Sequence, residues 1–200
     1  IGVIGGTGSG KTSLINMIPR FYDATKGEVL VNGTNVKEYT EEGLRNKIGI
    51  VPQKAVLFKG TIRSNLLWGN ESATENDLME ALKQAQSYDF VMQKENGIDS
   101  VVEQNGRNFS GGQRQRLTIA RALVRKPEIL ILDDSSSALD YTTDANLRKE
   151  IAKLKDMTVF IVSQRTASIM DADQIVVLDD GNIMGIGTHK ELLENCEVYK

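Results

Sequence analysis

The residues best suited to chemistry lie near the start of the chain, in the sequence GGTGSGKT at residues 5–12. The spacing of Gly5, Gly10, Lys11 and Thr12 is that of a phosphate-binding loop. Glycines let the backbone turn tightly, so that successive N–H groups converge on a polyphosphate. Lys11 adds a mobile cation for the terminal phosphates, and the Thr12 hydroxyl can bind Mg²⁺. We expect the phosphates to be bound by Gly6, Thr7, Gly8, Ser9, Gly10, Lys11, Thr12 and Ser13.

Two regular elements must hold this loop in place. The apolar residues 1–4 predict a strand before it, and residues 11–18 predict a helix after it. The N-terminal end of that helix carries the positive end of the helix dipole and would point at the same phosphates. A plain glycine- and serine-rich connector is the alternative, but it would not also place a lysine and a threonine at these positions.

A second candidate lies at residues 128–134. Residues 129–132 are apolar on both faces, as expected of a buried parallel strand, and Asp133 and Asp134 end it. In a phosphate-loop fold we expect this strand to lie beside the loop strand, which would place Asp133 to hold Mg²⁺ directly or through water. The alternative is that Asp133 serves only as a helix cap or turn residue.

A third candidate is the segment from Phe109 to Gln113. Ser110 is a suitable N-cap, and Gly111 and Gly112 would expose backbone N–H groups at a helix start, so the segment predicts a second anion site. On its own, the same pattern also fits an ordinary capped helix.

The remaining pattern predicts an α/β phosphate-loop core of mostly parallel strands with flanking helices. Residues 1–58 and 127–200 carry the strand signals, and a hairpin signal at residues 179–181 predicts an antiparallel β portion. Residues 59–126 read as an inserted helical subdomain without a good strand. We therefore expect one domain over residues 1–200, with a strand at residues 28–33 and with Leu57 and Phe58 exposed in a loop.

Composition narrows the function classes. The net charge of −3 gives no broad basic surface, so no nucleic-acid partner is expected. The single cysteine, Cys196, excludes an internal disulfide framework and fits a reducing compartment. The only histidine, His189, follows Thr188 and precedes Glu191 in a capping-box pattern, so we expect a surface residue of a first helical turn. The chain begins inside a predicted strand, and we expect it to be part of a longer protein.

Taken together, these motifs resemble the nucleotide-binding domain of ABC transporters over essentially the whole chain. Residues 5–12 match the Walker A loop and residues 129–133 the Walker B strand, while Gln53 matches the Q-loop glutamine. The signature sequence is matched by Ser110, Gly111, Gly112 and Gln113, with Phe109 where leucine is usual, and the D-loop by Ser137, Ala138, Leu139 and Asp140. Glu103 resembles the acidic residue of the exporter X-loop, and residues 57–65 are similar to an exporter segment.

The resemblance implies ATP as the nucleotide, with Mg²⁺ held by Thr12, Gln53 and Asp133. It also implies a head-to-tail dimer with a second nucleotide-binding domain, in which residues 110–113 would bind the partner's ATP. Transmembrane domains would be the other partners, reached through Gln53 and the helical insertion, at the cytoplasmic face of the cell membrane.

Two departures from the family pattern fall on the expected catalytic residues. Asp134 stands where the family usually has the general base Glu, and Gln164 stands where it usually has His. The carboxylate of Asp134 is one methylene shorter, and glutamine cannot relay a proton. Together with Gln53, these are the candidate catalytic residues. The paired change resembles the degenerate-site half of a heterodimeric bacterial exporter, so slow hydrolysis at this chain's own site is expected.

Several alternatives stay open. Asp134 could be a competent base in an ordinary homodimer, or the chain could be a nucleotide-gated dimerisation module with little turnover. A soluble ABC ATPase of DNA repair or translation is less well supported, because residues 59–126 are compact and residues 57–65 are exporter-like.

Overall fold

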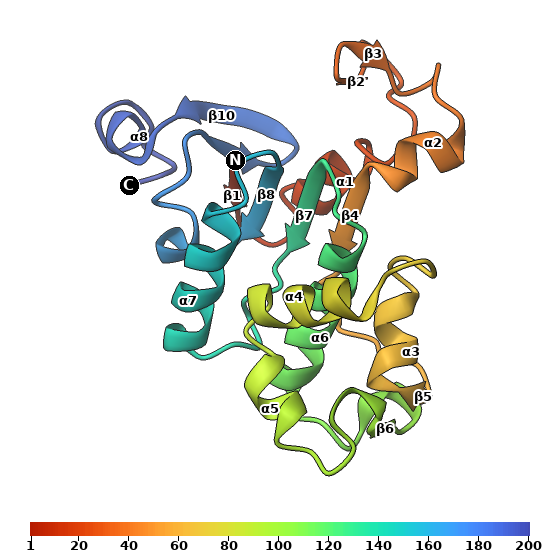
Figure 1. Cartoon of the computed structure of the whole chain (residues 1–200). Helices are drawn as coiled ribbons and strands as arrows, with labels where there is room; N and C mark the ends of the chain where they lie inside the picture. Colours follow the sequence, from red (N-terminus) through yellow and green to blue (C-terminus); the bar gives the residue numbers. More distant parts are fainter. The chain divides into compact units, whose positions relative to one another are not determined.

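The computed structural model describes all 200 residues (Figure 1). The chain divides into two compact units, which are described separately. The first comprises residues 1–48, 131–134 and 158–200, and the second comprises residues 49–130 and 135–157. The predicted insertion at residues 59–126 lies within the second unit, which also includes residues on both sides of it.

The first unit is built on a mostly parallel sheet. Its strands follow the order β10-β9-β1-β8-β7. Strand β4 (Ile48–Val51) begins at the last residue of the segment 1–48 and continues into the second unit. The bounds are Gly2–Gly5 for β1, Ile129–Asp133 for β7, Thr158–Ser163 for β8, Ile175–Asp179 for β9 and Asn182–Gly187 for β10. Strand β1 runs parallel to both β8 and β9, whereas β10 runs antiparallel to β9. The predicted α/β class and its antiparallel portion are confirmed.

The position of β7 differs from the sequence prediction. Strand β8, and not β7, lies beside the loop strand β1. The apolar pattern of residues 129–132 correctly indicates a buried strand. It could not identify the neighbour, because every buried parallel strand carries the same pattern.

Short elements complete the first unit. They are α1 (Lys11–Asn16), β2 (Leu30–Val31), β3 (Thr34–Asn35), α2 (Glu41–Asn46), η3 (Thr166–Ser168) and α8 (His189–Asn195). The strand expected at residues 28–33 is reduced to β2. Asn32 and Gly33 take positive φ angles of 51° and 77° and turn the chain directly into β3.

Helix α8 packs on β10 at the end of the chain (Figure 1). The predicted capping box of Thr188 and Glu191 is confirmed. His189 is half-buried rather than a plain surface residue, because its Nδ1 lies 2.8 Å from the hydroxyl of Tyr199. The tail of the chain is thereby tied to the first turn of the helix.

The second unit is mainly helical. It contains α3 (Ile62–Leu67), α4 (Glu75–Gln84), α5 (Tyr88–Met92), η1 (Gly97–Asp99), η2 (Gln104–Gly106), α6 (Gly111–Val124) and α7 (Tyr141–Ala152). Helices α3 and α4 both pack against α6, and Leu66, Leu82 and Leu117 are buried there. Each leucine buried in this way stabilises the folded state by roughly 1.5–3 kcal/mol.

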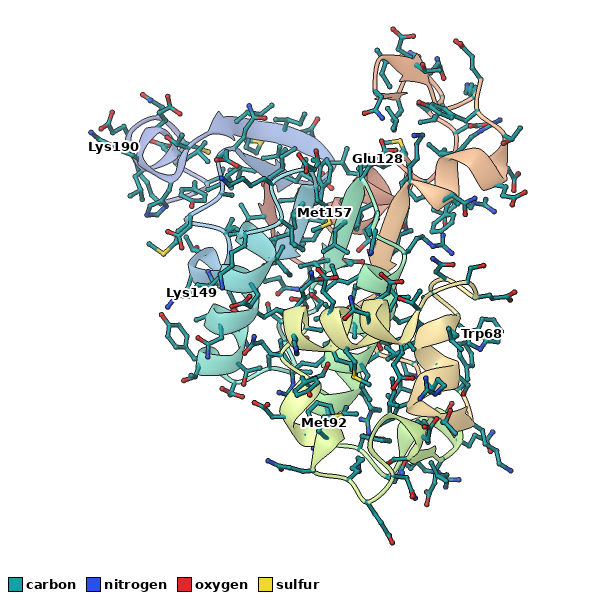
Figure 2. The ribbon with its side chains drawn as sticks, in the orientation of Figure 1. Trp68, Met92, Glu128, Lys149, Met157 and Lys190 are labelled. Carbon is teal, nitrogen blue, oxygen red and sulfur yellow. The ribbon has the colours of Figure 1, made fainter.

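Two details of the second unit correct the sequence predictions. A small antiparallel pair, β5 (Gly60–Thr61) with β6 (Val101–Val102), occurs where no strand was expected. Leu57 is only 1% exposed, whereas Phe58 is 43% exposed and stacks on Trp68 with ring centroids 4.8 Å apart. Trp68 projects from the end of α3 (Figure 2). Hydropathy could not separate the two loop residues, because only the packing decides which of them turns inward.

None of these helices combines the length and the apolar character needed to cross a bilayer.

Candidate functional site

The glycine loop between β1 and α1 has a backbone that other residues could not reproduce. A Cβ atom on Gly5 would lie 2.2 Å from the carbonyl oxygen of Leu178. Gly10, the N-cap of α1, has a φ of 94°, and no side chain caps the helix. The first N–H groups of α1 can therefore donate to an anion.

The turn between β9 and β10 supports the loop. The N–H of Gly181 donates to the carbonyl oxygen of Ser9 at 3.1 Å. The sequence predicted this turn as a hairpin but gave no signal that it touches the loop. Gly181 and Ser9 are far apart in the sequence, so no local pattern predicts the hydrogen bond between them.

Lys11 lies inside the loop. Its side chain is 9% exposed, and its ammonium donates to the carbonyl oxygens of Gly5 and Gly6 at 2.7 and 2.6 Å. The hydroxyl of Ser9 lies 3.4 Å from the same nitrogen. The cation is thus held beneath the exposed rim of the loop, which consists of Gly6, Thr7 and Gly8, with Thr12 and Ser13 exposed at the helix start.

Thr12, at the start of α1, and Asp133, at the end of β7, meet at the edge of this loop, although β7 is not a neighbour of the loop strand β1. The Thr12 hydroxyl donates to Oδ2 of Asp133 at 3.1 Å. Burial raises the pKa of the Asp133 carboxyl above its ordinary value, and the neighbouring Asp134 carboxylate also raises it, whereas the Thr12 hydrogen bond opposes the shift. A hydroxyl and a carboxylate are oxygen ligands of the type that Mg²⁺ prefers, so the residues fit that ion.

The two departures from the family pattern lie in the same unit as the loop. Asp134 directly follows β7 with a left-handed φ of 45°, and its N–H donates to the carbonyl oxygen of Val162 at 2.9 Å. Gln164 follows the neighbouring strand β8 with an exposed side chain. Their proposed catalytic roles remain predictions.

The signature segment forms the start of α6 in the second unit. The Ser110 hydroxyl accepts from the N–H of Gln113, and the Gln113 side chain accepts from the N–H of Ser110, so the predicted cap is confirmed. A Cβ on Gly111 would meet only the flexible Arg114 side chain, at 4.0 Å, whereas a Cβ on Gly112 would lie 3.2 Å from the carbonyl oxygen of Ala138. The signature therefore packs against the D-loop segment of its own unit.

The D-loop segment leads into α7. Ser137 and Ala138 are exposed, Leu139 is buried, and Asp140 caps the helix by accepting from the N–H of Thr143 at 2.9 Å. The hydroxyl and N–H of Thr143 hold the pKa of the Asp140 carboxyl below its ordinary value.

Gln53 lies between β4 and β5, in the second unit, with an exposed side chain. It lines a cavity together with Gly111 and Ala138. The structure thus gathers Lys11, Thr12, Asp133, Asp134 and Gln164 in the first unit. It gathers the Q-loop glutamine, the signature and the D-loop in the second.

Comparison with known proteins gives a consistent result. Residues 1–137 match the model of the ABC transporter family. The chain is 46% identical over 200 residues to YfiB of Bacillus subtilis, an uncharacterized ABC transporter ATP-binding protein, covering all of this chain and 35% of that one. It is also 46% identical to the uncharacterized ABC transporter ATP-binding protein Rv1273c of Mycobacterium tuberculosis, over 98% of this chain and 34% of that one.

Among solved structures, a bacterial Atm1-family ABC exporter with ATP bound superposes on 99% of this chain and 35% of its own. The TM-score is 0.94 and the sequence identity is 35%. The chain therefore spans about a third of the length of the relatives it matches. The family match, the shared fold and the assembled loop lead to one conclusion: the chain belongs to the ABC transporter family and is a nucleotide-binding domain.

Proposed function

We propose that this domain binds ATP with Mg²⁺ at its glycine loop and hydrolyses it in a head-to-tail dimer to drive export. The observation that carries the proposal is the convergence of Lys11, Thr12 and Asp133 on one loop. The exporter fold of the ATP-bound neighbour supports the transport role. The proposed partners are a second nucleotide-binding domain and transmembrane domains, at the cytoplasmic face of the cell membrane.

The chain's own residues would bind the nucleotide through backbone N–H groups at the start of α1 and through the ammonium of Lys11. Thr12 and Asp133 would hold the metal, with Gln53 as the third proposed ligand. When bound, Mg²⁺ would neutralise charge on the phosphate oxygens. Residues 110–113 would serve the nucleotide of the partner domain, through the exposed backbone of Gly111 at the start of α6.

We infer that hydrolysis at this chain's own loop is slow. The Asp134 carboxylate is one methylene shorter than the family's Glu, and a misplacement of about 1 Å can cost about 100-fold in rate. Gln164 can donate a hydrogen bond but cannot carry a positive charge or accept and pass on a proton. This combination favours the degenerate-site half of a heterodimer, whose other site would be completed by this chain's signature.

The test is the double variant Asp134→Glu with Gln164→His in the full-length protein together with its partner half. ATP turnover at this site should rise by roughly 10- to 100-fold, because the base and the proton relay are restored. Each single variant should give less than the pair. The same double variant carrying Lys11→Ala is the control and should show no increase. Unchanged turnover with intact nucleotide binding would reject the geometric account.

A second candidate function is a nucleotide-gated dimerisation module, which the same two residues favour. In that case ATP would promote association of the two domains, and the double variant would still turn over no nucleotide. Sedimentation with and without ATP, run beside the turnover assay, separates the two functions.

A further inference from the structure

The cavity that Gln53 lines has an unusual charge. Its volume is about 490 Å³, and it lies within the second unit, between the segment after β4, the η2 region and the first turns of α6. Three basic side chains line it, those of Lys54, Arg107 and Arg114, and no carboxylate does. A cavity whose charged side chains are all cationic concentrates anions.

A buried residue with an unpaired donor also lines this cavity. Gln115, on α6, is 1% exposed, lines the cavity, and its Nε2 has no hydrogen-bond partner. A buried polar group left without a partner costs roughly 1–3 kcal/mol. An acceptor atom supplied by a ligand would satisfy it.

Two further features favour an anion at the same place. Gly111, the first residue of the 14-residue helix α6, lines the cavity, so the positive end of that helix dipole faces it. Arg114 is already ordered, because its Nη1 donates to the carbonyl oxygen of Phe109 at 2.7 Å. An arginine held in this way loses little side-chain freedom when its remaining N–H groups bind a ligand.

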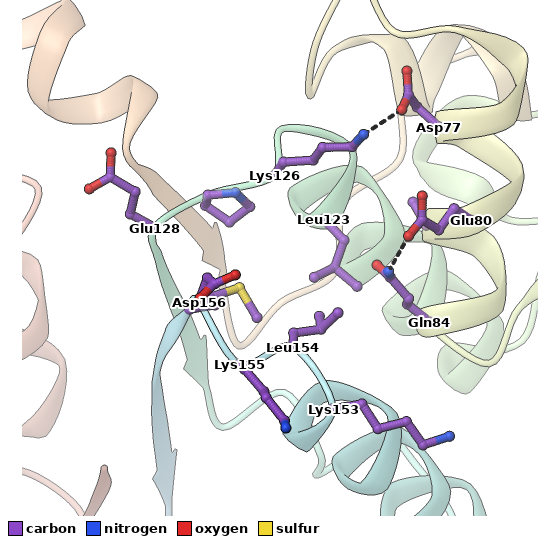
Figure 3. Close-up of a pocket in the computed structure, with 13 residues that line it drawn as sticks. Asp77, Glu80, Gln84, Leu123, Lys126, Glu128, Lys153, Leu154, Lys155 and Asp156 are labelled. Atoms are coloured by element: carbon purple, nitrogen blue, oxygen red, sulfur yellow. Dashed lines mark hydrogen bonds and ion pairs between the residues drawn. The ribbon is translucent and has the colours of Figure 1, made fainter.

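A second cavity of this unit provides a contrast (Figure 3). Its volume is about 640 Å³, and both acidic and basic side chains line it. Two pairs of these groups bond to each other, Lys126 to Asp77 at 2.6 Å and Gln84 to Glu80 at 3.1 Å. The charged side chains of this cavity carry both signs, whereas those of the all-basic cavity carry one, so only the all-basic cavity favours an anion.

We propose that the cavity lined by Arg107, Arg114 and Gln115 binds a phosphate group. Arginine matches phosphate oxygens with paired N–H donors, and the buried amide adds another donor. The phosphate would be either a free inorganic anion or the tail of a nucleotide, since the same donors serve both. Gln53, Gly111 and Ala138 border the cavity, so an anion there would link the Q-loop, the signature and the D-loop of one unit. None of the residues that line this cavity belongs to the glycine loop, and binding there requires no hydrolysis.

The experiment uses the chain carrying Lys11→Ala, which removes the cation of the glycine loop. Inorganic phosphate is titrated by calorimetry in about 0.15 M chloride, where surface charges are screened, and ATP is titrated in a parallel arm. In this background, Arg107→Ala should weaken binding about 10-fold or more, because a charge-assisted hydrogen bond is lost. Lys155→Ala, which removes an exposed lysine from the other cavity, is the matched control and should change the affinity less than twofold.

Gln115→Met gives a second readout. Methionine fills a similar volume without the unpaired donor, so phosphate affinity should fall severalfold while the melting temperature without phosphate stays the same or rises. A purely structural glutamine would instead lower the melting temperature. If Arg107→Ala lowers only the affinity for ATP, the ligand is the phosphate tail of the nucleotide. If it also lowers the affinity for inorganic phosphate, the free anion binds. Absence of saturable binding of either ligand to the Lys11→Ala chain, or equal losses for Arg107→Ala and Lys155→Ala, would overturn the proposal.

Discussion

The two helix N-termini proposed to meet ATP are built in opposite ways. Helix α1, in the first unit, starts at a left-handed glycine, has six residues and has no side-chain cap. Helix α6, in the second unit, starts at Ser110, has 14 residues and closes its own capping box. The loop before α1 places a lysine beneath its exposed rim, whereas residues 110–113 of the signature include no cation.

Because of this difference, a bound nucleotide should affect the stability of the two helix starts differently. The free N–H groups of α1 gain most when an anion satisfies them, so the first unit should be stabilised strongly by nucleotide. The capped start of α6 is satisfied internally and should fold equally well without a ligand. Its binding role would depend on exposed backbone at Gly111 rather than on an unsatisfied helix end.

The largest effect should come from Lys11→Ala. Removing the ammonium that sits inside the loop should weaken ATP binding by about 100-fold or more, because no other cation lies within hydrogen-bond distance of Gly5 and Gly6. Calorimetric titration with MgATP measures this. Lys190→Ala, on the exposed first turn of α8, is the control and should leave affinity intact. If Lys11→Ala binds MgATP as tightly as the parent chain, the glycine loop is not the ATP site.

The next largest effect is the difference in stability between alanine variants of Gly5 and Gly111. Gly5→Ala should destabilise the chain by several kcal/mol or prevent folding, since its Cβ would meet the Leu178 carbonyl at 2.2 Å. Gly111→Ala should cost little, because a Cβ there would make only an ordinary contact with the Arg114 side chain, at 4.0 Å. Urea unfolding of both variants, in the absence of nucleotide, makes the comparison. Equal stabilities would mean that the two glycine segments are not constrained differently.

A smaller effect is expected at the cap of α6. Ser110→Ala should lower the free energy of unfolding by about 1 kcal/mol, because the N–H of Gln113 loses its acceptor. For a chain of this size, that corresponds to a fall in melting temperature of roughly 2–4 °C. Ser110→Asp keeps a capping acceptor and should retain most of the stability. A melting temperature that Ser110→Ala does not change would contradict the self-capped description.

The smallest effect concerns Asp133. Its pKa is raised in the folded state, so the folded chain holds this proton more tightly than the unfolded chain does. The free energy of unfolding therefore falls as the pH rises from the ordinary pKa of aspartate through the raised pKa of the folded state. Asp133→Asn should therefore be slightly more stable than the parent near pH 7 and no more stable below the ordinary pKa of aspartate. Unfolding curves across pH 3–7, without metal or nucleotide, test this sign.

The same variant should lose the Mg²⁺ dependence of ATP binding, because an amide replaces the metal-binding carboxylate. A stability advantage that grew as the pH fell would reject the assigned cause of the shift.

Local features were predictable from the sequence because local chemistry decides them. The caps at Thr188 and Ser110 and the turn at Gly181 each depend on a few neighbouring residues, and all three are confirmed. Hydropathy also indicated the buried strand β7, because its apolar side chains must be hidden on both faces of the sheet.

Features that depend on packing at long range were not predictable. The insertion of β8 between β1 and β7, the burial of Leu57 and the contact of Gly181 with Ser9 join residues far apart in sequence. No local pattern encodes which strand is a neighbour, since that choice depends on how all strands fill the sheet together.

The sequence by itself determined that a glycine loop, an acidic strand end and a capped signature helix exist, because residue type and spacing fix backbone conformation over a few positions. Only the tertiary structure decided that the Thr12 hydroxyl reaches Asp133 across an intervening strand and that the Nε2 of Gln115 is buried without a hydrogen-bond partner beside a basic cavity. Those arrangements follow from the packing of whole elements, in which the free energy of many apolar contacts outweighs the preference of any single residue.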